Sequence, residues 1–239
     1  MTGNGNVIDY SILLATRGRP SQVERLFQSI LDTADHPEVI EIILYMDDDD
    51  HESHTINHPS LKLKKLIGPK ISMGGMHRRC YEASSGNLIM IVGDDNVFRT
   101  RSWDTRVKEE FKRFPDDIGL VYCNDLIQGM NMCTAPFLTR KACDFMDSIC
   151  PDDYTGEFID THILDVFTKL KYWGYIRIAY LDDIVIEHLH YVAGKAAYDE
   201  TYANKAPTNE NRNLFFRLDP DRVATARKIV HYISGGTKS

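Results

Sequence analysis

The stretch "LIMIVGDDNVFRT", residues 88–100, joins a continuous apolar segment to two adjacent carboxylates. An apolar run without alternation is typical of a strand that is covered on both faces of a parallel sheet. Asp94 and Asp95 follow the run directly, and ionised carboxylates at the edge of a core require compensation of their charge. The segment therefore predicts a buried strand whose end carries a compensated pair of acidic side chains.

Earlier parts of the chain repeat this arrangement. Strand patterns occupy residues 7–16, 39–46 and 61–67. A helical spacing follows the first of them, with Ser21 and Glu24 placed as an S-x-x-E capping box, and residues 74–86 are long enough for a second helix. This order of strands and helices predicts an α/β domain in which helices cover both faces of a mainly parallel sheet.

Polar residues stand at the ends of three of these strands. They are "TRGR" at 16–19, "DDDD" at 47–50 and "GDDN" at 93–96. Folds of this class bind ligands beyond the carboxyl ends of their parallel strands. We therefore expect the three clusters to meet in one site.

The second half of the chain predicts further elements. Helices are expected at residues 103–111, 156–174 and 219–234, and strands at 118–123 and 175–192. Pro220 suits the first turn of the last helix. The segment from Ala193 to Asn213, rich in Lys, Asn, Tyr and Thr, is interpreted as a mobile loop.

The totals limit the class of protein. The chain has 239 residues, 43% of them hydrophobic, which is enough for one substantial core and predicts a single domain. A net charge of −7 indicates no global attraction to nucleic acid or to an anionic membrane, although a local basic groove is compatible with it. No segment has the roughly 18 apolar residues needed to span a bilayer, and the N-terminus has no leader pattern. Five cysteines without a CxxC pair indicate reduced thiols and a cytoplasmic location.

The pair Asp94 and Asp95 has two interpretations. Adjacent carboxylates in a partly dry site favour a divalent cation, and oxygen ligands select hard ions such as Mg²⁺ or Mn²⁺, which bridge protein carboxylates to substrate phosphates. Alternatively, Gly-Asp-Asp-Asn is simply a turn, because these residue types are the commonest in turns. The local sequence leaves both interpretations open.

Three further groups have two interpretations each. Glu157 and Asp160 stand three residues apart near the start of the long predicted helix, either as catalytic carboxylates or as partners of the helix dipole. His188 shares a strand face with a second histidine and is either a metal ligand or an ordinary half-buried residue. Arg78 and Arg79 are either phosphate-binding groups or part of a solvated helix face.

Four segments, taken in order, resemble the nucleotide-sugar-dependent glycosyltransferases of the GT-A fold, in particular the inverting enzymes of family 2. They are "SILLATRGRPSQVERLFQSIL" (11–31), "IEIILYMDD" (40–48), "HRRCYEASSGNLIMIVGDDN" (77–96) and "IDTHILDVFTKLKYWGY" (159–175). The resemblance implies a single Rossmann-like GT-A domain with a mixed, mainly parallel central sheet flanked by helices, plus C-terminal helices. It divides the chain into a nucleotide-binding half at about 8–100, an acceptor and catalytic half at about 101–195, and a mobile loop with C-terminal helices at about 196–239.

The resemblance also implies roles for individual residues. Those that it assigns to the nucleotide-sugar donor are Thr16, Arg17, Asp48, Arg78, Arg79 and Asp94, and the position of Lys195 in a loop near the site adds it to this set. Among them, Thr16 and Arg17 would lie against the base and ribose, and Asp48 would accept a hydrogen bond from a uracil-type imide. Asp94 would contact the ribose, and the loop with Lys195 would close over the diphosphate.

The catalytic assignments follow from the same resemblance. Asp95 would bind the metal, Mn²⁺ or Mg²⁺, with His188 completing its coordination, and Asp160 would be the general base. Ile159 replaces the usual glutamate before the base, so Glu157 is an alternative to Asp160. Gly93 stands where many members have the first aspartate of the metal motif, which leaves the register open and makes Asn96 a further candidate.

The implied function is metal-dependent, inverting transfer of a sugar from a nucleotide diphosphate, a UDP-sugar by first choice, to a hydroxyl acceptor. The acceptor region, residues 124–145, does not reveal its specificity. Saccharides, lipid-linked intermediates, proteins, small molecules and modified bases of phage DNA remain open as acceptors, so a nucleic acid is not excluded.

Three other functions are compared with this one. A nucleotidyltransferase would show a Gly-rich phosphate loop after the first strand, where "ATRGRP" has a single glycine. A non-catalytic module that binds nucleotide sugars or saccharides is the second alternative. A strand followed by Gly-Asp-Asp also resembles the metal-binding hairpin of viral RNA polymerases, but those enzymes need finger and thumb regions for which 239 residues leave little room.

Overall fold

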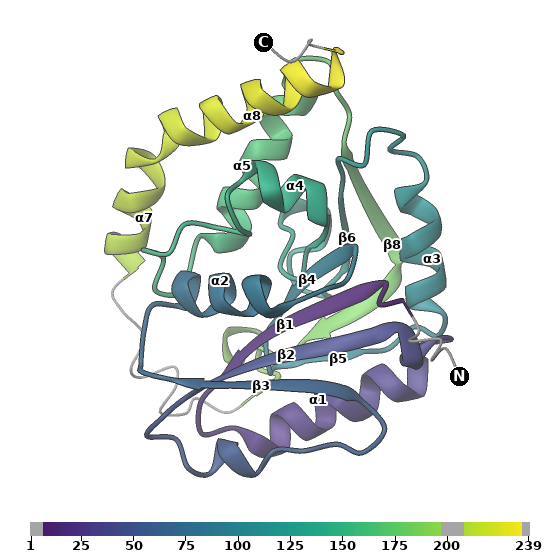
Figure 1. Ribbon diagram of the computed structural model, residues 1–239, viewed down its shortest axis with the longest axis vertical. Coiled ribbons are helices and arrows are strands. Elements are labelled where there is room, and N and C mark those ends of the chain that lie inside the picture. The colour runs from purple at the N-terminus through teal and green to yellow at the C-terminus, as the bar shows by residue number, and fades with distance from the viewer. Residues whose placement is uncertain (1–6, 197–207, 236–239) are drawn as a thin grey trace, which may run out of the picture.

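The computed structural model describes residues 7–196 and 208–235 (Figure 1). Its strands are β1 Tyr10–Thr16, β2 Ile40–Asp47, β3 Lys62–Gly68, β4 Leu88–Val92, β5 Asn96–Phe98, β6 Leu120–Asn124, β7 Phe137–Thr139 and β8 Ile178–His188. In the described ranges they form one sheet in the order β3-β2-β1-β4-β7-β6-β8-β5. β1 runs parallel to β2 and β4, β2 to β3, and β6 to β8, whereas β7 and β5 pair antiparallel with their neighbours. The expected mixed, mainly parallel sheet is confirmed.

Helices cover both faces of this sheet. They are α1 Pro20–Thr33, α2 Met73–Ala83, α3 Trp103–Phe111, α4 Arg140–Phe145, α5 Ile159–Tyr172, α7 Thr208–Arg217 and α8 Asp219–Ile233. Helices α1 and α3 pack on one face, and α2, α4, α5, α7 and α8 pack on the other (Figure 1). Successive residues of β1 alternate between these two cores, with Ile12 and Leu14 in the first and Leu13 in the second. This double coverage explains why the central strands are continuously apolar.

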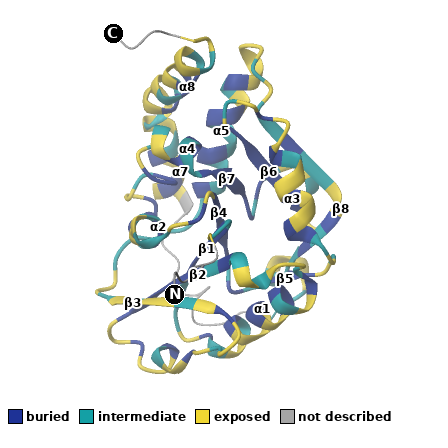
Figure 2. Cartoon of the chain, turned by 45° about the vertical axis from the view of Figure 1, so that its right-hand side comes forward, coloured by how far each residue is buried: buried dark blue, intermediate teal, exposed yellow. Residues whose placement is uncertain are grey.

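The sheet is buried at its centre and open at the β3 edge (Figure 2). β3 has alternating partial burial, and its three lysines, Lys62, Lys64 and Lys65, are exposed. Lys64 Nζ donates to the Ala83 carbonyl at 2.9 Å and Lys65 Nζ to the His54 carbonyl at 3.0 Å. The edge strand is therefore a charged surface of the molecule.

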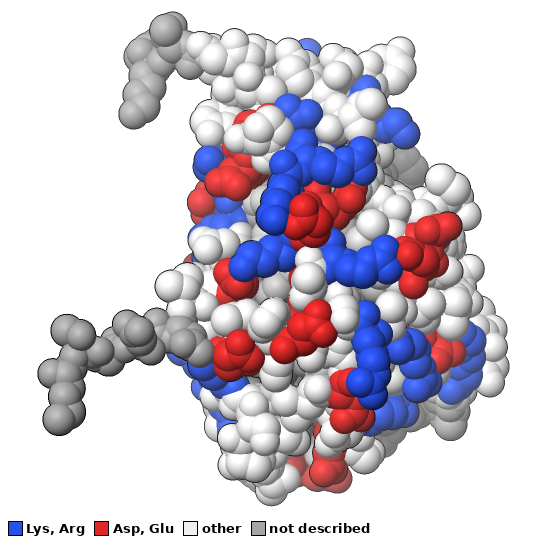
Figure 3. Space-filling model, turned by 90° about the vertical axis from the view of Figure 1, so that its right-hand side faces the viewer, with Lys and Arg blue, Asp and Glu red and all other residues white. Residues whose placement is uncertain are grey.

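Charges of both signs are intermixed on the face formed by α3 and β8 (Figure 3). Ion pairs connect Arg99 with Glu187 and Arg106 with Asp183, each at 2.8 Å. Arg99 and Arg106 are thus each neutralised by an acidic neighbour on this face.

Two local predictions are wrong. The capping box of Ser21 and Glu24 does not form, because α1 begins at Pro20, with Arg19 as an N-cap that makes no side-chain capping bond. Proline at the first helical position has a preset backbone angle and needs no N–H partner, so it starts the helix one residue before Ser21. The predicted mobile loop from Ala193 to Asn213 is wrong at its C-terminal end, because residues 208–213 belong to α7. Residues 197–207 of that prediction lie outside the described ranges.

The cysteines are confirmed as free thiols, and all of them are buried. Within residues 7–196 and 208–235, no helix combines the length and the apolar character needed to cross a membrane.

Candidate active site

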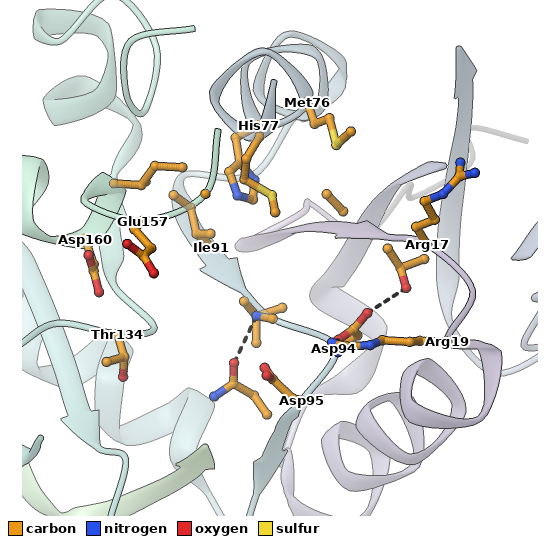
Figure 4. Close-up of a pocket in the computed structure, with 18 of the residues that line it drawn as sticks. Arg17, Arg19, Met76, His77, Ile91, Asp94, Asp95, Thr134, Glu157 and Asp160 are labelled. Atoms are coloured by element: carbon orange, nitrogen blue, oxygen red, sulfur yellow. Dashed lines mark hydrogen bonds and ion pairs between the residues drawn. The ribbon is translucent and has the colours of Figure 1, made fainter. Parts of the chain in front are cut away.

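A cavity of about 1240 Å³ lies at the carboxyl ends of β1, β2 and β4. The three polar clusters meet in it, through Thr16 at the end of β1 and Arg17 after it, Asp47 at the end of β2, and Asp94 and Asp95 after β4. Residues from the start of α2, the start of α5 and the end of β8 complete its wall. Figure 4 shows Arg17 and Arg19 on one side of this cavity and Glu157, Asp160 and Thr134 on the other.

Asp94 is compensated by a guanidinium. Arg19 Nη1 donates to Asp94 Oδ1 at 2.9 Å, and the Thr16 hydroxyl donates to Asp94 Oδ2 at 2.7 Å. The two charged side chains are 7% and 8% exposed, so this ion pair is buried. Burial raises the pKa of Asp94, and the positive charge of Arg19 opposes that effect. Arg19 is thus a site residue to which the sequence reading assigned no role.

Asp95 lies beside His188. Antiparallel pairing of β5 with β8 sets Asn96 opposite His188, and the backbone N–H of Leu189 donates to the Asp95 carbonyl at 2.8 Å. As a result, His188 Nε2 is 3.4 Å from Asp95 Oδ2, and both side chains line the cavity. The sequence-predicted metal pair is therefore brought together by a long-range strand contact.

The described residues contain no group of three or more His, Cys, Asp or Glu side chains arranged to hold a metal. Asp95 and His188 supply one carboxylate and one imidazole, both suited to Mn²⁺, and the carboxylate is also suited to Mg²⁺. Such ions commonly take one or two protein ligands and complete their shell with phosphate oxygens and water. The donor set therefore fits a divalent ion that is held jointly by protein and substrate.

Gly93 makes room for the Asp95 carboxylate. A Cβ atom at position 93 would lie 2.5 Å from Asp95 Oδ1, which is closer than real Cβ atoms approach other atoms. Asn96 closes the same turn, since its Oδ1 accepts the Gly93 N–H at 2.9 Å. A side chain at position 93 would therefore require the Asp95 carboxylate to shift, and Asn96 has a structural role in the turn.

Asp160 and Glu157 stand at the amino end of α5. Asp160 Oδ1 accepts the Thr161 N–H at 2.7 Å, whereas its Oδ2 makes no hydrogen bond to any side chain or backbone group of the described chain. Burial raises the pKa of Asp160 above its ordinary value. Phe158, between the two carboxylates, has a φ of 71°, a left-handed conformation that is strained for an aromatic residue. Strain of this kind concentrates at functional sites.

The acidic segment that begins at the last residue of β2 places Asp47, and not Asp48, on the cavity wall. Asp47 is 2% exposed, and its Oδ2 accepts a hydrogen bond from Arg17 Nη1 at 2.9 Å. Its Oδ1 is buried without a partner among the described residues. Asp48 is exposed and is not one of the residues that line the cavity.

Arg78, Arg79 and Lys195 likewise do not line the cavity. Arg78 forms an ion pair with Asp152 and donates from Nη1 to the Asp147 carbonyl at 2.7 Å, while Arg79 is exposed. Lys195 Nζ donates to Glu187 Oε1 at 2.9 Å. In this conformation Arg78 and Lys195 bind other parts of the protein, and Arg79 is exposed outside the cavity.

The face of α2 that meets the cavity carries Met73, Met76 and His77. His77 is 4% exposed, and its Nδ1 has no hydrogen-bond partner within the described chain. Burial lowers the pKa of His77 to about 4, so the imidazole is neutral at pH 7. The i, i+3, i+4 spacing of these residues is the signal that would have identified this face.

No protein-family model and no curated protein sequence matches the chain. Among solved structures, the whole chain aligns with 80% of the mannosyltransferase PcManGT from Pyrobaculum calidifontis, solved with GDP-Man and Mn²⁺, at 12% identity and a TM-score of 0.60. Of the chain, 90% aligns with 66% of S. aureus TarS 1–349, solved with UDP-GlcNAc, at 11% identity and a TM-score of 0.66. In a longer TarS structure, 75% of the chain spans 36% of that protein, at 13% identity and a TM-score of 0.56. The chain therefore has the GT-A-like α/β fold of these glycosyltransferases.

Proposed function

We propose that the chain is a glycosyltransferase that moves a sugar from a nucleotide diphosphate donor to a hydroxyl acceptor. The observation that carries this proposal is one cavity with two distinct acidic centres, Asp95 beside His188 and Asp160 at the start of α5. The donor complexes of the structural neighbours, GDP-Man with Mn²⁺ in one and UDP-GlcNAc in another, support this class of donor.

The nucleoside would bind where Arg17 and Asp47 meet. A buried carboxylate oxygen without a partner is unfavourable until it accepts a hydrogen bond, and Asp47 Oδ1 is such an atom. The ring N–H of uracil or guanine is a suitable donor. Asp47 therefore takes the role that the resemblance assigned to Asp48, with a uridine nucleotide as the first choice.

Asp95 and His188 would hold Mn²⁺ or Mg²⁺ together with the diphosphate. A bound divalent cation supplies positive charge to the oxygens of the departing nucleotide. Arg19 fixes the Asp94 carboxylate beside this centre, so it is positioned for a ribose hydroxyl without moving. The absence of a side chain at Gly93 preserves the position of Asp95.

Asp160 would accept the proton of the attacking hydroxyl. Its raised pKa brings it closer to the operating pH, which makes it a stronger base than an ordinary aspartate, and its Oδ2 is available for the acceptor. Because it lies across the cavity from Arg17 and Arg19, attack would come from the face opposite the leaving nucleotide and would invert the anomeric centre. Glu157 is the second candidate for this role.

Turnover of a panel of nucleotide sugars, with and without Mn²⁺, tests the proposal. Release of the nucleotide supports transfer, release of pyrophosphate indicates a nucleotidyltransferase, and donor binding without either product indicates a binding module. The anomeric configuration of the product, measured by NMR, tests inversion, and a retained configuration rejects it.

Two variants separate the roles of the acidic centres. Asp160→Asn is expected to bind the donor normally and to lose transfer by about 10²-fold to 10⁴-fold, whereas Asp95→Ala is expected to lose metal-dependent donor binding. Asp153→Asn, at an exposed carboxylate that does not line the cavity, is the matched control. If Asp160→Asn transfers at the parent rate, the base is not Asp160, and Glu157→Gln is the next variant to measure.

A further inference from the structure

The loop between β6 and β7 is held in place by a buried carboxylate. Asp125 is 2% exposed, and its Oδ1 accepts the backbone N–H groups of Ile127, Gln128 and Gly129 at 3.0, 2.7 and 2.9 Å. Its Oδ2 accepts the hydroxyl of Thr134 at 3.1 Å. A carboxylate that accepts several N–H groups makes strong, oriented hydrogen bonds. The loop therefore has a defined shape.

This ordered loop exposes large apolar side chains. Leu126, Ile127 and Met130 are 47%, 40% and 67% exposed, and Val192, on the 3₁₀ turn Tyr191–Ala193, is 74% exposed. Leu126 has a φ of 60°, a left-handed conformation that a leucine rarely adopts. Packing within the fold does not explain a strained, well-bonded loop that holds apolar groups in water. We call Leu126, Ile127, Met130 and Val192 the apolar rim.

The apolar rim adjoins the Asp160 end of the cavity. Ile127 and Val192 are among the residues that line the cavity. Farther along the same loop, Cys133 Sγ donates to the Asp160 carbonyl at 3.3 Å, and the Thr161 hydroxyl donates to Met132 Sδ at 3.7 Å. Figure 4 shows Thr134, from this loop, on the side of Asp160 and away from Arg17. A molecule that presents a hydroxyl to Asp160 would therefore meet the rim first at Ile127.

The chemistry of the loop limits what it can contact. Residues 126–134, "LIQGMNMCT", contain no charged side chain. Phosphate-rich acceptors such as nucleic acid are bound chiefly through Arg and Lys, and this segment has none. An apolar group that covers exposed Leu, Ile and Met side chains, in contrast, removes apolar surface from water, and this burial favours binding. The rim therefore matches an uncharged, apolar group.

We propose that the acceptor carries an apolar group, such as an alkyl chain, beside its reacting hydroxyl, and that the apolar rim binds this group. The inference rests on the proposed transferase function, because it assigns the acceptor side of the same cavity. It names the class of acceptor that the sequence left open.

The expected effect follows from the area that an alkyl chain buries. A fully buried methylene changes a binding constant about fourfold. Because the rim is open to solvent on one side, we expect the binding constant to change about twofold for each methylene. The butyl glycoside, with three more methylenes than the methyl glycoside, should therefore bind roughly tenfold more tightly.

The experiment compares the binding of methyl and butyl β-D-glucoside by NMR titration, and it does not depend on transfer. The wild type is expected to prefer the butyl glucoside about tenfold, and the double variant Ile127→Ser, Met130→Ser is expected to lose this preference. Tyr172→Ser, which removes an apolar side chain that is 88% exposed on the last turn of α5, is the control and should keep it. Circular dichroism verifies that each variant is folded.

Equal binding of the two glucosides to the wild type would overturn the inference, as would an unchanged preference in the rim variant. Preferential, salt-dependent binding of a DNA duplex to this loop would also overturn it. Binding of nucleotide sugars and their hydrolysis by water, both measured without any glycoside, test the donor side of the cavity separately. If donors are turned over but the chain-length preference is absent, only the inference fails, whereas failure to bind or turn over any nucleotide sugar removes the proposed function itself.

Discussion

Replacing Arg19 by methionine tests whether a guanidinium is the cation that permits Asp94 to be buried. Methionine keeps an apolar stem in place and removes the charge. Because the two side chains are only 7% and 8% exposed, the variant leaves a buried carboxylate with the Thr16 hydroxyl as a donor. Removing one partner of a buried ion pair costs about 3–5 kcal/mol of unfolding free energy.

Protonation of Asp94 sets an upper limit on this loss. An aspartate with the ordinary pKa of 3.8 requires about 1.4 kcal/mol for each pH unit above that value to take up a proton. The limit is therefore about 4 kcal/mol at pH 7 and less than about 2 kcal/mol at pH 5. We expect the unfolding free energy of Arg19→Met to be about 3–4 kcal/mol below that of the wild type at pH 7. At pH 5 we expect this loss of unfolding free energy to be smaller.

Urea unfolding followed by circular dichroism measures the loss of unfolding free energy at pH 7 and at pH 5. Arg106→Met is the matched control, because Arg106 and its partner Asp183 are 44% and 59% exposed, so removal of this guanidinium should cost far less. The double variant Arg19→Met, Asp94→Asn should recover much of the stability, since no buried charge remains. A loss below about 1 kcal/mol at pH 7, or the same loss at both pH values, would show that Arg19 is not the compensating charge.

Three further predictions follow from the described geometry. Gly93→Ala should displace the Asp95 carboxylate and weaken Mn²⁺-dependent binding of a UDP-sugar about tenfold, or about 1.4 kcal/mol, with little change in the unfolding free energy. Calorimetric titration measures the affinity, and an affinity equal to that of the wild type would contradict the prediction. Because burial raises the pKa of Asp160 and the base must be deprotonated, kcat/KM should fall on acidification with a midpoint above 3.8, and a pH profile without such a limb argues against this base. Burial lowers the pKa of His77 to about 4 and of His162 to about 3, whereas in the unfolded chain both imidazoles take up protons near 6.5. The unfolding free energy should therefore decrease as the pH falls from 6.5 toward 4, with a smaller slope in His77→Gln, and urea titrations that show no such decrease would contradict the assignment.

The buried strands and amphipathic helices were predictable because their signals are local. β1, β2 and β4 are apolar throughout and were placed within a few residues of their observed bounds. β5 and β7 were missed because each has only three residues and owes its extended form to pairing with distant strands. α7 was missed because it is polar, and its sequence has the composition of a loop.

The site was predictable in its acidic residues but not in their partners. Arg19 and Asp94 are 75 positions apart, so no local pattern connects them, and the choice between Asp47 and Asp48 depended on where β2 ended. Arg78 and Arg79 were selected by charge, whereas the rotation of α2 turns His77 toward the cavity. Residue types thus indicated the chemistry, while helix phase and strand register determined which side chains meet.

The lysine-bearing edge of the sheet affects how the protein behaves at high concentration. A strand from a second molecule that paired with β3 would have to approach Lys62, Lys64 and Lys65 and desolvate their ammonium groups. β3 has no acidic residue to offset them, so two copies of this edge also repel one another. The open side of the sheet is in this way protected against intermolecular β-pairing and the aggregation to which it leads.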